Sequence, residues 1–172
     1  MTQYSVFDVF SDVPFGGNPL AIIADAAALP EASLQKIARE FNFSETVFLY
    51  PPTNAAHTAK MRIFTPTMEI PFAGHPTIGT AVALAQAGHG PDMVLELGVG
   101  PLAAKATGER AEFHTPVPLN ILAEPEPTLV AAALGLSTDE ITTDNHPPML
   151  ASIGLPFTLT ELKSREALAR CE

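Results

Sequence analysis

The sequence has little of three things that would point to common classes of protein. One cysteine occurs among 172 residues, Cys171, which excludes an intramolecular disulfide, a cysteine-rich zinc site and any mechanism that needs two thiols. Nine basic residues face nineteen acidic ones, so the formal charge is -10 and nucleic acid would be repelled. No apolar run approaches the roughly 18 residues of a membrane span, and the first four residues do not resemble a signal peptide. We therefore expect a cytoplasmic protein that binds neither nucleic acid nor membrane.

Familiar nucleotide, hydrolase and metal motifs are missing as well. The sequence contains no P-loop, no G-x-G-x-x-G and no G-x-S-x-G. Four of the histidines show neither the i, i+4 pairing nor the carboxylate spacing that is typical of a metal site. They are His57, His89, His114 and His146. We predict no metal site.

The composition, with 47% hydrophobic and 16% charged residues, is that of a folded protein of one ordinary domain or two small ones. Apolar residues at helical spacing over residues 30–41 predict an amphipathic surface helix, and Asn42 suits the left-handed position that ends it. Short runs rich in β-branched and aromatic residues predict strands over 4–10, 20–23, 45–50 and 60–64.

The segment His75–Ala87 has no charged face, so we predict a helix that is buried all round. A chain of this size can bury such a helix by curling a sheet about it, with further strands over 93–97, 102–106 and 110–113. Gly79 would let one strand approach the helix closely. The expected fold class is α+β, with a sheet wrapped around a central buried helix.

A proline-punctuated stretch, with prolines at 116, 118, 125 and 127, predicts a linker between a first lobe over 1–117 and a second over 118–172. The pattern G-x-P-apolar-x-apolar occurs at residues 17–22 and again at 154–159, each time before a helical segment, which is weak support for a duplication. Only about 52 residues follow Asn120, and the last predicted helix, 164–171, has two turns and no glycine cap. We expect one complete lobe and the start of a second, as in a fragment of a longer architecture.

The stretch 65–79, TPTMEIPFAGHPTIG, runs from a strand end through a turn into the buried helix. Pro76 suits the first helical position, and the next N–H groups, from Thr77 onward, lie at the positive end of the helix dipole. Gly74 would let a ligand approach the backbone, so we predict a seat for a carboxylate or phosphate, with His75 as donor or proton handler. An equally plausible reading makes His75 an N-cap residue with a satisfied side chain.

Glu45 is a second candidate, because strand alternation places it on the face of Val47 and Leu49. If that face is inward, burial would raise the pKa of the Glu45 carboxyl toward neutrality, as suits a group that takes and returns a proton. The alternative is a solvated acid, which is commoner since glutamate is seldom buried. Glu69 has the same ambiguity and is expected to hold its turn. Asn18 could point into a pocket, although asparagine before proline is more often a turn former.

Four segments together resemble the phenazine-biosynthesis-like (PhzF) isomerase family, which shares the diaminopimelate-epimerase fold. They are FDVF, PFGGNPLAII, KIAREFNFSET and RIFTPTMEIPFAGHPTIGTA, and the ordered motifs NFSETVF and PFAGHPTIG make the resemblance specific. Weaker similarity continues through ALGL, ASIGLPF and LKSREALA, which resemble the start of the family's second lobe. The resemblance implies two similar lobes with an active site in the cleft between them.

The resemblance also implies roles. Glu45 matches the family's acid/base glutamate, which moves a proton between carbons of a cyclic substrate without a cofactor, and Gly74 and His75 match the substrate-binding turn. Asn18, Pro76 and Thr77 complete the predicted binding set for a small carboxylate. Cysteine-dependent epimerases of this fold have a thiol where this chain has Ala73. The second lobe's D-P-A-T-G-S type motif does not occur after Asn120, so we expect the chain alone to lack half of the cleft.

Three functions remain open at this point. The leading hypothesis is a PhzF-type isomerase in which Glu45 shuttles a proton and the 74–77 turn holds a carboxylate. The second, suggested by the missing part of the second lobe, is a non-catalytic protein: either an inactive truncated product or a remnant that keeps the fold and forms a homodimer over apolar surface between Met149 and Leu159. The third is a binding module whose affinity for carboxylates depends on the 74–77 turn and not on Glu45.

Overall fold

A computed structural model describes residues 3–115 and 118–171 of the chain. The chain divides into a first unit, Met1–Pro116, and a second unit, Val117–Glu172. The predicted division between residues 117 and 118 adjoins this boundary, and Pro116 and Val117 themselves lie outside the described residues. Each unit has its own sheet.

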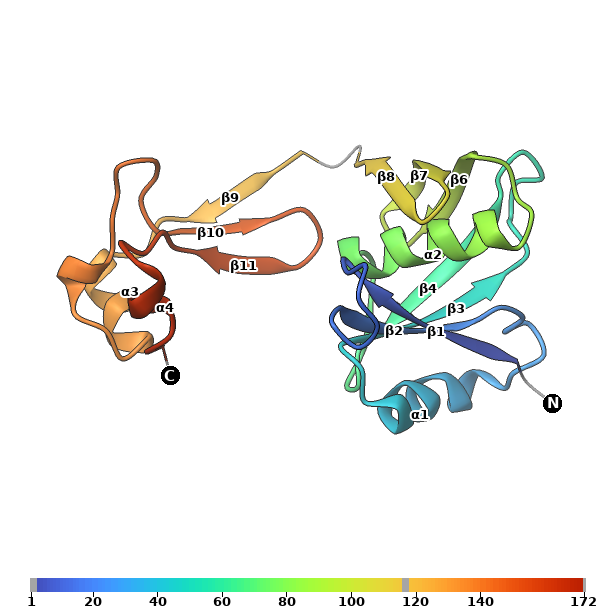
Figure 1. The fold of residues 1–172 in the computed structure, drawn as a ribbon, viewed down its shortest axis with the longest axis horizontal. Coiled ribbons are helices and arrows are strands. Elements are labelled where there is room, and N and C mark those ends of the chain that lie inside the picture. The colour runs from blue at the N-terminus through green and yellow to red at the C-terminus, as the bar shows by residue number, and fades with distance from the viewer. Residues whose placement is uncertain (1–2, 116–117, 172) are drawn as a thin grey trace. The chain divides into compact units, whose positions relative to one another are not determined.

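The first unit contains a single mixed sheet whose strands follow the order β1-β2-β3-β4-β6-β7-β8, with β5 paired to β4 (Figure 1). Neighbouring strands are antiparallel, except that β2–β3 and β4–β6 are parallel. The strands are β1 Tyr4–Val9, β2 Asn18–Ile23, β3 Glu45–Tyr50, β4 Ala59–Phe64, β5 Glu69–Ile70, β6 Asp92–Leu97, β7 Gly100–Thr107 and β8 Arg110–His114.

Helix α2, Gly74–Gln86, lies inside the curl of this sheet (Figure 1). It contacts β1, β2 and β3 toward one end of the strand order and β7 and β8 at the other, so the sheet bends around it. The helix carries no charged residue and is buried along most of its length, while Ile78, Ala83 and Ala85 stay partly exposed. The predicted α+β fold is confirmed, and the predicted burial holds on most sides of the helix rather than on all.

Gly79 permits the close packing of α2 on the sheet. A Cβ atom at this position would lie 2.5 Å from Leu20 Cδ2 and 2.8 Å from Val9 Cγ2, closer than real Cβ contacts. These two side chains belong to β2 and β1. The predicted close approach of a strand at Gly79 is confirmed.

Helix α1, Glu31–Phe41, packs on the other face of the sheet. Its Leu34 and Ala38 are buried against Phe48 of β3 and Phe64 of β4, and the polar side of the helix faces solvent. Asn42 ends the helix with φ of 54°, the left-handed conformation that was predicted for it.

Two predicted element boundaries near the site are wrong by one or two residues. Helix α2 begins at Gly74, so Pro76 is its third residue rather than its first. Strand β1 ends at Val9 instead of continuing to Phe10, because Phe10 adopts a left-handed backbone with φ of 65° that no strand can accommodate.

The second unit has an antiparallel sheet of three strands in the order β11-β10-β9. A small apolar cluster of Val130, Ala131 and Ile141 packs beside it under Leu134 and Leu162. The elements are β9 Asn120–Ala123, α3 Pro127–Ala133, the 3₁₀ helix η1 Thr138–Glu140, β10 Met149–Ser152, β11 Pro156–Leu159 and α4 Arg165–Leu168.

The last helix is shorter than the sequence predicts. Helix α4 makes a single turn over Arg165–Leu168 in place of the two turns expected over 164–171. Ser164 caps it, since its Oγ accepts a hydrogen bond from the Ala167 N–H at 3.1 Å. In the part of the chain that the model describes, no helix is both long and apolar enough to cross a membrane.

Candidate functional site

Three chain segments bring the predicted site residues together in the first unit. Strands β2 and β3 run parallel, with Leu20 opposite Glu45, so both strands begin at the same edge of the sheet. Asn18 is the first residue of β2 and Glu45 the first of β3. Helix α2 begins at this edge too, and its second residue, His75, contacts both strands.

The centre of the site is a hydrogen-bonded pair of Glu45 and His75. The Nδ1 atom of His75 lies 2.8 Å from Glu45 Oε2, and its Nε2 atom lies 3.2 Å from the carbonyl oxygen of Asn18. Both partners are acceptors, so His75 donates to both at once only as the imidazolium ion. The His75 side chain is 8% exposed and that of Glu45 19%, so the pair is largely shielded but open to solvent on the glutamate side.

The expected direction of the Glu45 pKa is wrong. The hydrogen bond from His75 holds the pKa of the Glu45 carboxyl below its usual value, and this effect outweighs burial, which acts in the opposite direction. The local sequence around Glu45 indicates burial but not the hydrogen bond to a histidine thirty residues away. The pair with His75 therefore favours the ionised form of Glu45.

Asn18 supports the Glu45–His75 pair through its backbone, and its side chain is hydrogen-bonded within the protein. Its side-chain Oδ1 accepts a hydrogen bond from Ser44 Oγ at 2.9 Å, while its backbone carbonyl meets His75. These bonds join the start of β2 to the residue before β3 and to α2. The side chain of Asn18 is thus occupied by the protein's own Ser44.

The start of α2 has the features expected of an anion seat. Its N-cap residue is Ala73, which has no side chain that could cap the helix. Thr77 is fully buried, and its Oγ1 donates to the Ala73 carbonyl at 2.8 Å, so this hydroxyl points back along the helix. A Cβ at Gly74 would meet only Phe113 Cζ within 4 Å, at 3.7 Å, so the backbone here is open to a small group. Pro76 is buried and supplies no N–H.

Glu69 lies outside this group. Both of its carboxylate oxygens accept hydrogen bonds from Arg62, at 2.7 and 2.6 Å, and Arg62 also binds Glu31 of α1. Glu69 therefore fixes β5 to β4 and to the beginning of α1, which agrees with a role in holding its turn.

Two residues near the pair were not predicted from the sequence. Ser44 could have been found because it precedes Glu45 directly. Phe10 lies with its ring centroid 6.3 Å from that of His75.

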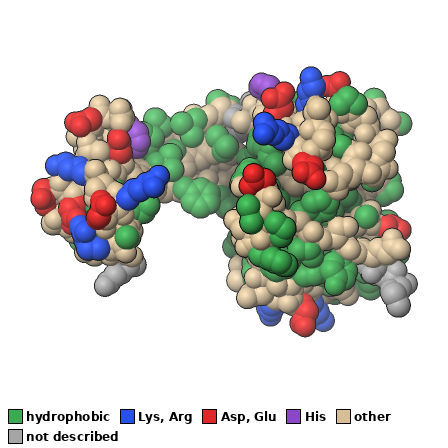
Figure 2. Space-filling view, in the orientation of Figure 1, with side chains coloured by type: hydrophobic (Ala, Val, Ile, Leu, Met, Phe, Trp, Pro, Cys, Tyr) green, Lys and Arg blue, Asp and Glu red, His purple; other side chains and the backbone are tan. Residues whose placement is uncertain are grey.

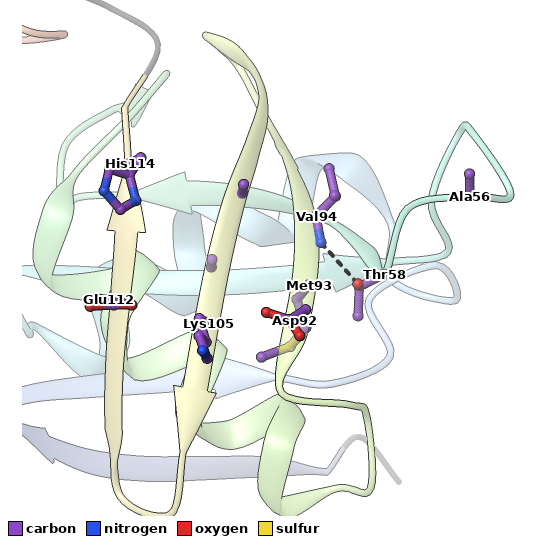
Figure 3. Close-up of a pocket in the computed structure, with 10 residues that line it drawn as sticks. Ala56, Thr58, Asp92, Met93, Val94, Lys105, Glu112 and His114 are labelled. Carbon is purple, nitrogen blue, oxygen red and sulfur yellow. Dashed lines mark hydrogen bonds between the residues drawn. The ribbon is translucent and has the colours of Figure 1, made fainter.

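A groove of about 440 Å³ lies elsewhere on the unit, on the exposed face of β6, β7 and β8 (Figure 3). Lys105 is flanked across the strands by Asp92 and Glu112. Charges of alternating sign side by side are typical of a solvated sheet surface. None of the predicted site residues lines this groove. Among the described residues no cluster of three or more His, Cys, Asp or Glu side chains could hold a metal ion.

In the first unit a sheet curls around an uncharged helix, and the first turn of that helix supplies the histidine of a glutamate–histidine pair. Comparison with known proteins agrees. The family model described as phenazine biosynthesis-like protein matches residues 7–172. An uncharacterized isomerase of Mesorhizobium japonicum is 42% identical over 98% of this chain, and a trans-2,3-dihydro-3-hydroxyanthranilate isomerase of Pseudomonas fluorescens is 38% identical over 91%. A crystallised predicted epimerase from Pseudomonas aeruginosa covers 99% of the chain with a TM-score of 0.85 and 33% identity.

The chain belongs to the phenazine biosynthesis-like protein family. It spans 58% of the length of the two isomerases and 62% of the crystallised epimerase. The family resemblance given by NFSETVF and PFAGHPTIG is therefore confirmed, and both motifs contribute to the site, through Glu45 and His75.

Proposed function

We propose that the first unit binds a small carboxylated substrate at the start of α2, and that Glu45 moves a proton on that substrate without a cofactor, as in a PhzF-type isomerase. The observation that carries the proposal is the 2.8 Å hydrogen bond between Glu45 and His75 at the uncapped helix end. A helix N-terminus favours an anion through its unpaired N–H groups and its dipole.

The proposed step is a proton transfer in which no electron is gained or lost. The Glu45 carboxylate accepts a proton from one carbon of the substrate, and the resulting carboxylic acid returns it to another carbon, so a double bond shifts position. His75 is a positioning residue, because its Nδ1 atom is hydrogen-bonded to the Glu45 carboxylate while its Nε2 atom lies 3.2 Å from the Asn18 carbonyl oxygen. Gly74, Pro76 and Thr77 form the turn that would receive the substrate carboxylate.

The test is deuterium incorporation at carbon in D₂O, followed by NMR. The first probe is trans-2,3-dihydro-3-hydroxyanthranilate, since a relative is named as its isomerase. Whatever exchange rate the chain supports without the second lobe's D-P-A-T-G-S type motif, we expect Glu45→Gln to slow it at least a hundredfold, in keeping with the usual contribution of an acid/base group, about 10²–10⁴-fold. Glu69→Gln is the matched control and should exchange at the unaltered rate. Exchange that persists in Glu45→Gln would remove Glu45 from the mechanism.

A second candidate function is association of two copies through the sheet of the second unit. Ile121 and Phe157 flank Ala151 from either side in the strand register, and Leu159 pairs with Met149. By strand alternation these side chains share one face, on which Ile121, Phe157 and Leu159 are 51%, 62% and 43% exposed. Figure 2 shows hydrophobic side chains over these strands. An uncharged apolar sheet face of this kind favours pairing with an identical copy.

Sedimentation velocity tests this second function. We expect a concentration-dependent dimer that Phe157→Ser weakens, because the substitution replaces the most exposed of the three apolar side chains on the face with a polar hydroxyl. Phe15→Ser, the same substitution at an even more exposed phenylalanine in the first unit, should leave the sedimentation coefficient unaltered. A monomer at all concentrations for the unaltered chain would exclude the homodimer.

A further inference from the structure

The turn between β1 and β2 exposes an unusual amount of apolar surface beside the site. Phe10, Val13 and Phe15 are 73%, 60% and 97% exposed. Phe10 and Phe15 both adopt left-handed backbone conformations, with φ of 65° and 64°. Such angles are outliers for bulky side chains and persist only where the surroundings enforce them.

Hydrogen bonds within the turn enforce this conformation. The Asp8 carboxylate accepts from the Phe15 N–H at 2.7 Å, and the Gly16 N–H donates to the Val13 carbonyl at 3.0 Å. Ser11 Oγ donates to the Val13 carbonyl and accepts from the Val13 N–H. The aromatic rings are therefore presented on a well-defined frame, so a ligand that contacts them would lose little affinity to ordering of the loop.

The two phenylalanines differ in their relation to the site. The ring centroid of Phe10 lies 6.3 Å from that of His75 at an interplanar angle of 53°, within the range of aromatic pairs. Phe15, at 97% exposure, touches almost nothing. Phe10 is too exposed to be a core residue. Its ring adds apolar surface beside the His75 side chain, which is itself 8% exposed.

We infer that Phe10 determines specificity, forming an apolar wall against which the non-carboxylate part of the ligand lies. The inference rests on the proposed function, because it assumes that the start of α2 takes the carboxylate. A carboxylate whose body is flat and unsaturated would lie against the Phe10 ring while its charge reaches the helix N-terminus. A short aliphatic acid would fill the seat without touching Phe10.

The experiment is an NMR titration of the full chain with benzoate and with propionate, followed through the amides of Gly74, His75 and Thr77. We expect benzoate to bind about three- to tenfold more tightly than propionate, the range of an aromatic contact. Phe10→Ala should abolish this preference and leave propionate affinity unchanged. Phe15→Ala is the matched control, since it removes the same ring from the same backbone conformation, and it should keep the preference.

The outcomes separate the two proposals. If both acids bind and Phe10→Ala alters neither affinity, or alters them as Phe15→Ala does, the role of Phe10 is wrong and the carboxylate seat stands. If neither acid shifts the α2 amides, both proposals fall. Phe10→Gly, which relieves the left-handed strain, repeats the measurement without a stability penalty and should show the same lost preference.

Discussion

The two units differ in how completely the apolar side chains of their sheets are buried. In the first unit the sheet encloses α2 on one face and carries α1 on the other, so large side chains such as Phe48 and Leu95 are completely buried. In the second unit Ile121, Phe157 and Leu159 lie exposed on a three-stranded sheet. A sheet with one apolar face needs a partner layer, and the second unit has none on that face among its described residues.

Strand formation and core formation are separate requirements in this chain. The second unit has regular antiparallel register, apart from one irregularity between Leu150 and Ala151, although its buried cluster is small. Backbone pairing thus specifies its strands, while the free energy of unfolding depends on apolar burial that this unit largely lacks. The following variants test that contrast.

The largest expected effect comes from truncating a phenylalanine in each unit. Phe48→Ala should lower the free energy of unfolding of the first unit by about 3–5 kcal/mol, because it leaves a cavity in a closed core. Phe157→Ala, the same change on a side chain that is exposed in the monomer, should stay within about 0.5 kcal/mol at concentrations too low for two copies to associate. Denaturant unfolding followed by NMR signals from each unit measures both. Equal losses would contradict the contrast.

A smaller effect is expected at the single-turn helix of the second unit. Ser164→Ala removes the acceptor for the Ala167 N–H and should cost about 1 kcal/mol of local stability, seen as faster amide exchange of Ala167. Ser164→Asp retains a capping oxygen and should restore the protection. Unchanged exchange in Ser164→Ala would show that α4 does not depend on its cap.

A local titration distinguishes the site from the rest of the first unit. Because His75 lowers the pKa of Glu45, the pair stabilises the fold above the ordinary carboxyl pKa of 4.5, and this contribution is lost as the pH falls through the folded pKa. In His75→Leu the Glu45 pKa should rise, since burial is then opposed only by the weaker effect of the hydrogen bond from Ser44. His57→Leu, which breaks the other histidine–glutamate pair, should leave the Glu45 titration by carbon-13 NMR unaltered.

The smallest effect is expected at Glu96, far from the proposed ligand. Its carboxylate accepts the N–H groups of Asn54 and Thr53, both at 2.8 Å, and also binds His57, and these bonds lower its pKa to about 2. The stabilisation from these hydrogen bonds is fully present above pH 4.5 and is lost only as the pH falls through about 2. Glu96→Gln should speed amide exchange at residues 53 and 54, whereas Glu112→Gln on β8 should not.

Much of the first unit could be predicted from sequence because its signals are local. The 3.6-residue spacing of α1, the left-handed Asn42 and the uncharged run of α2 each depend on neighbouring residues. The second unit was harder, since its strands have four residues each and α4 has one turn. Short elements owe their existence to tertiary pairing, which periodicity does not reveal.

The sequence indicated Glu45 and His75 as candidate site residues, but it did not indicate the electrostatics of their contact. Glu45 and His75 were identified separately, but their contact depends on the parallel pairing of β2 with β3, a long-range feature. The burial of Glu45 was therefore weighed without the hydrogen bond that reverses the direction of its pKa shift. Phe10 escaped notice for a related reason: its aromatic character fitted the strand pattern, and only its backbone angle removes it from β1.

Helix α2 bridges strands that lie at opposite ends of the first unit's sequence, from β1 at residue 4 to β8 at residue 114. Contacts of such long range make folding slow, with times of about milliseconds to seconds for sheet proteins of high contact order. During synthesis, α2 can pack against β7 and β8 only after nearly the whole unit has left the ribosome. Until then its uncharged surface is exposed, and the growing chain is most vulnerable to aggregation in that interval.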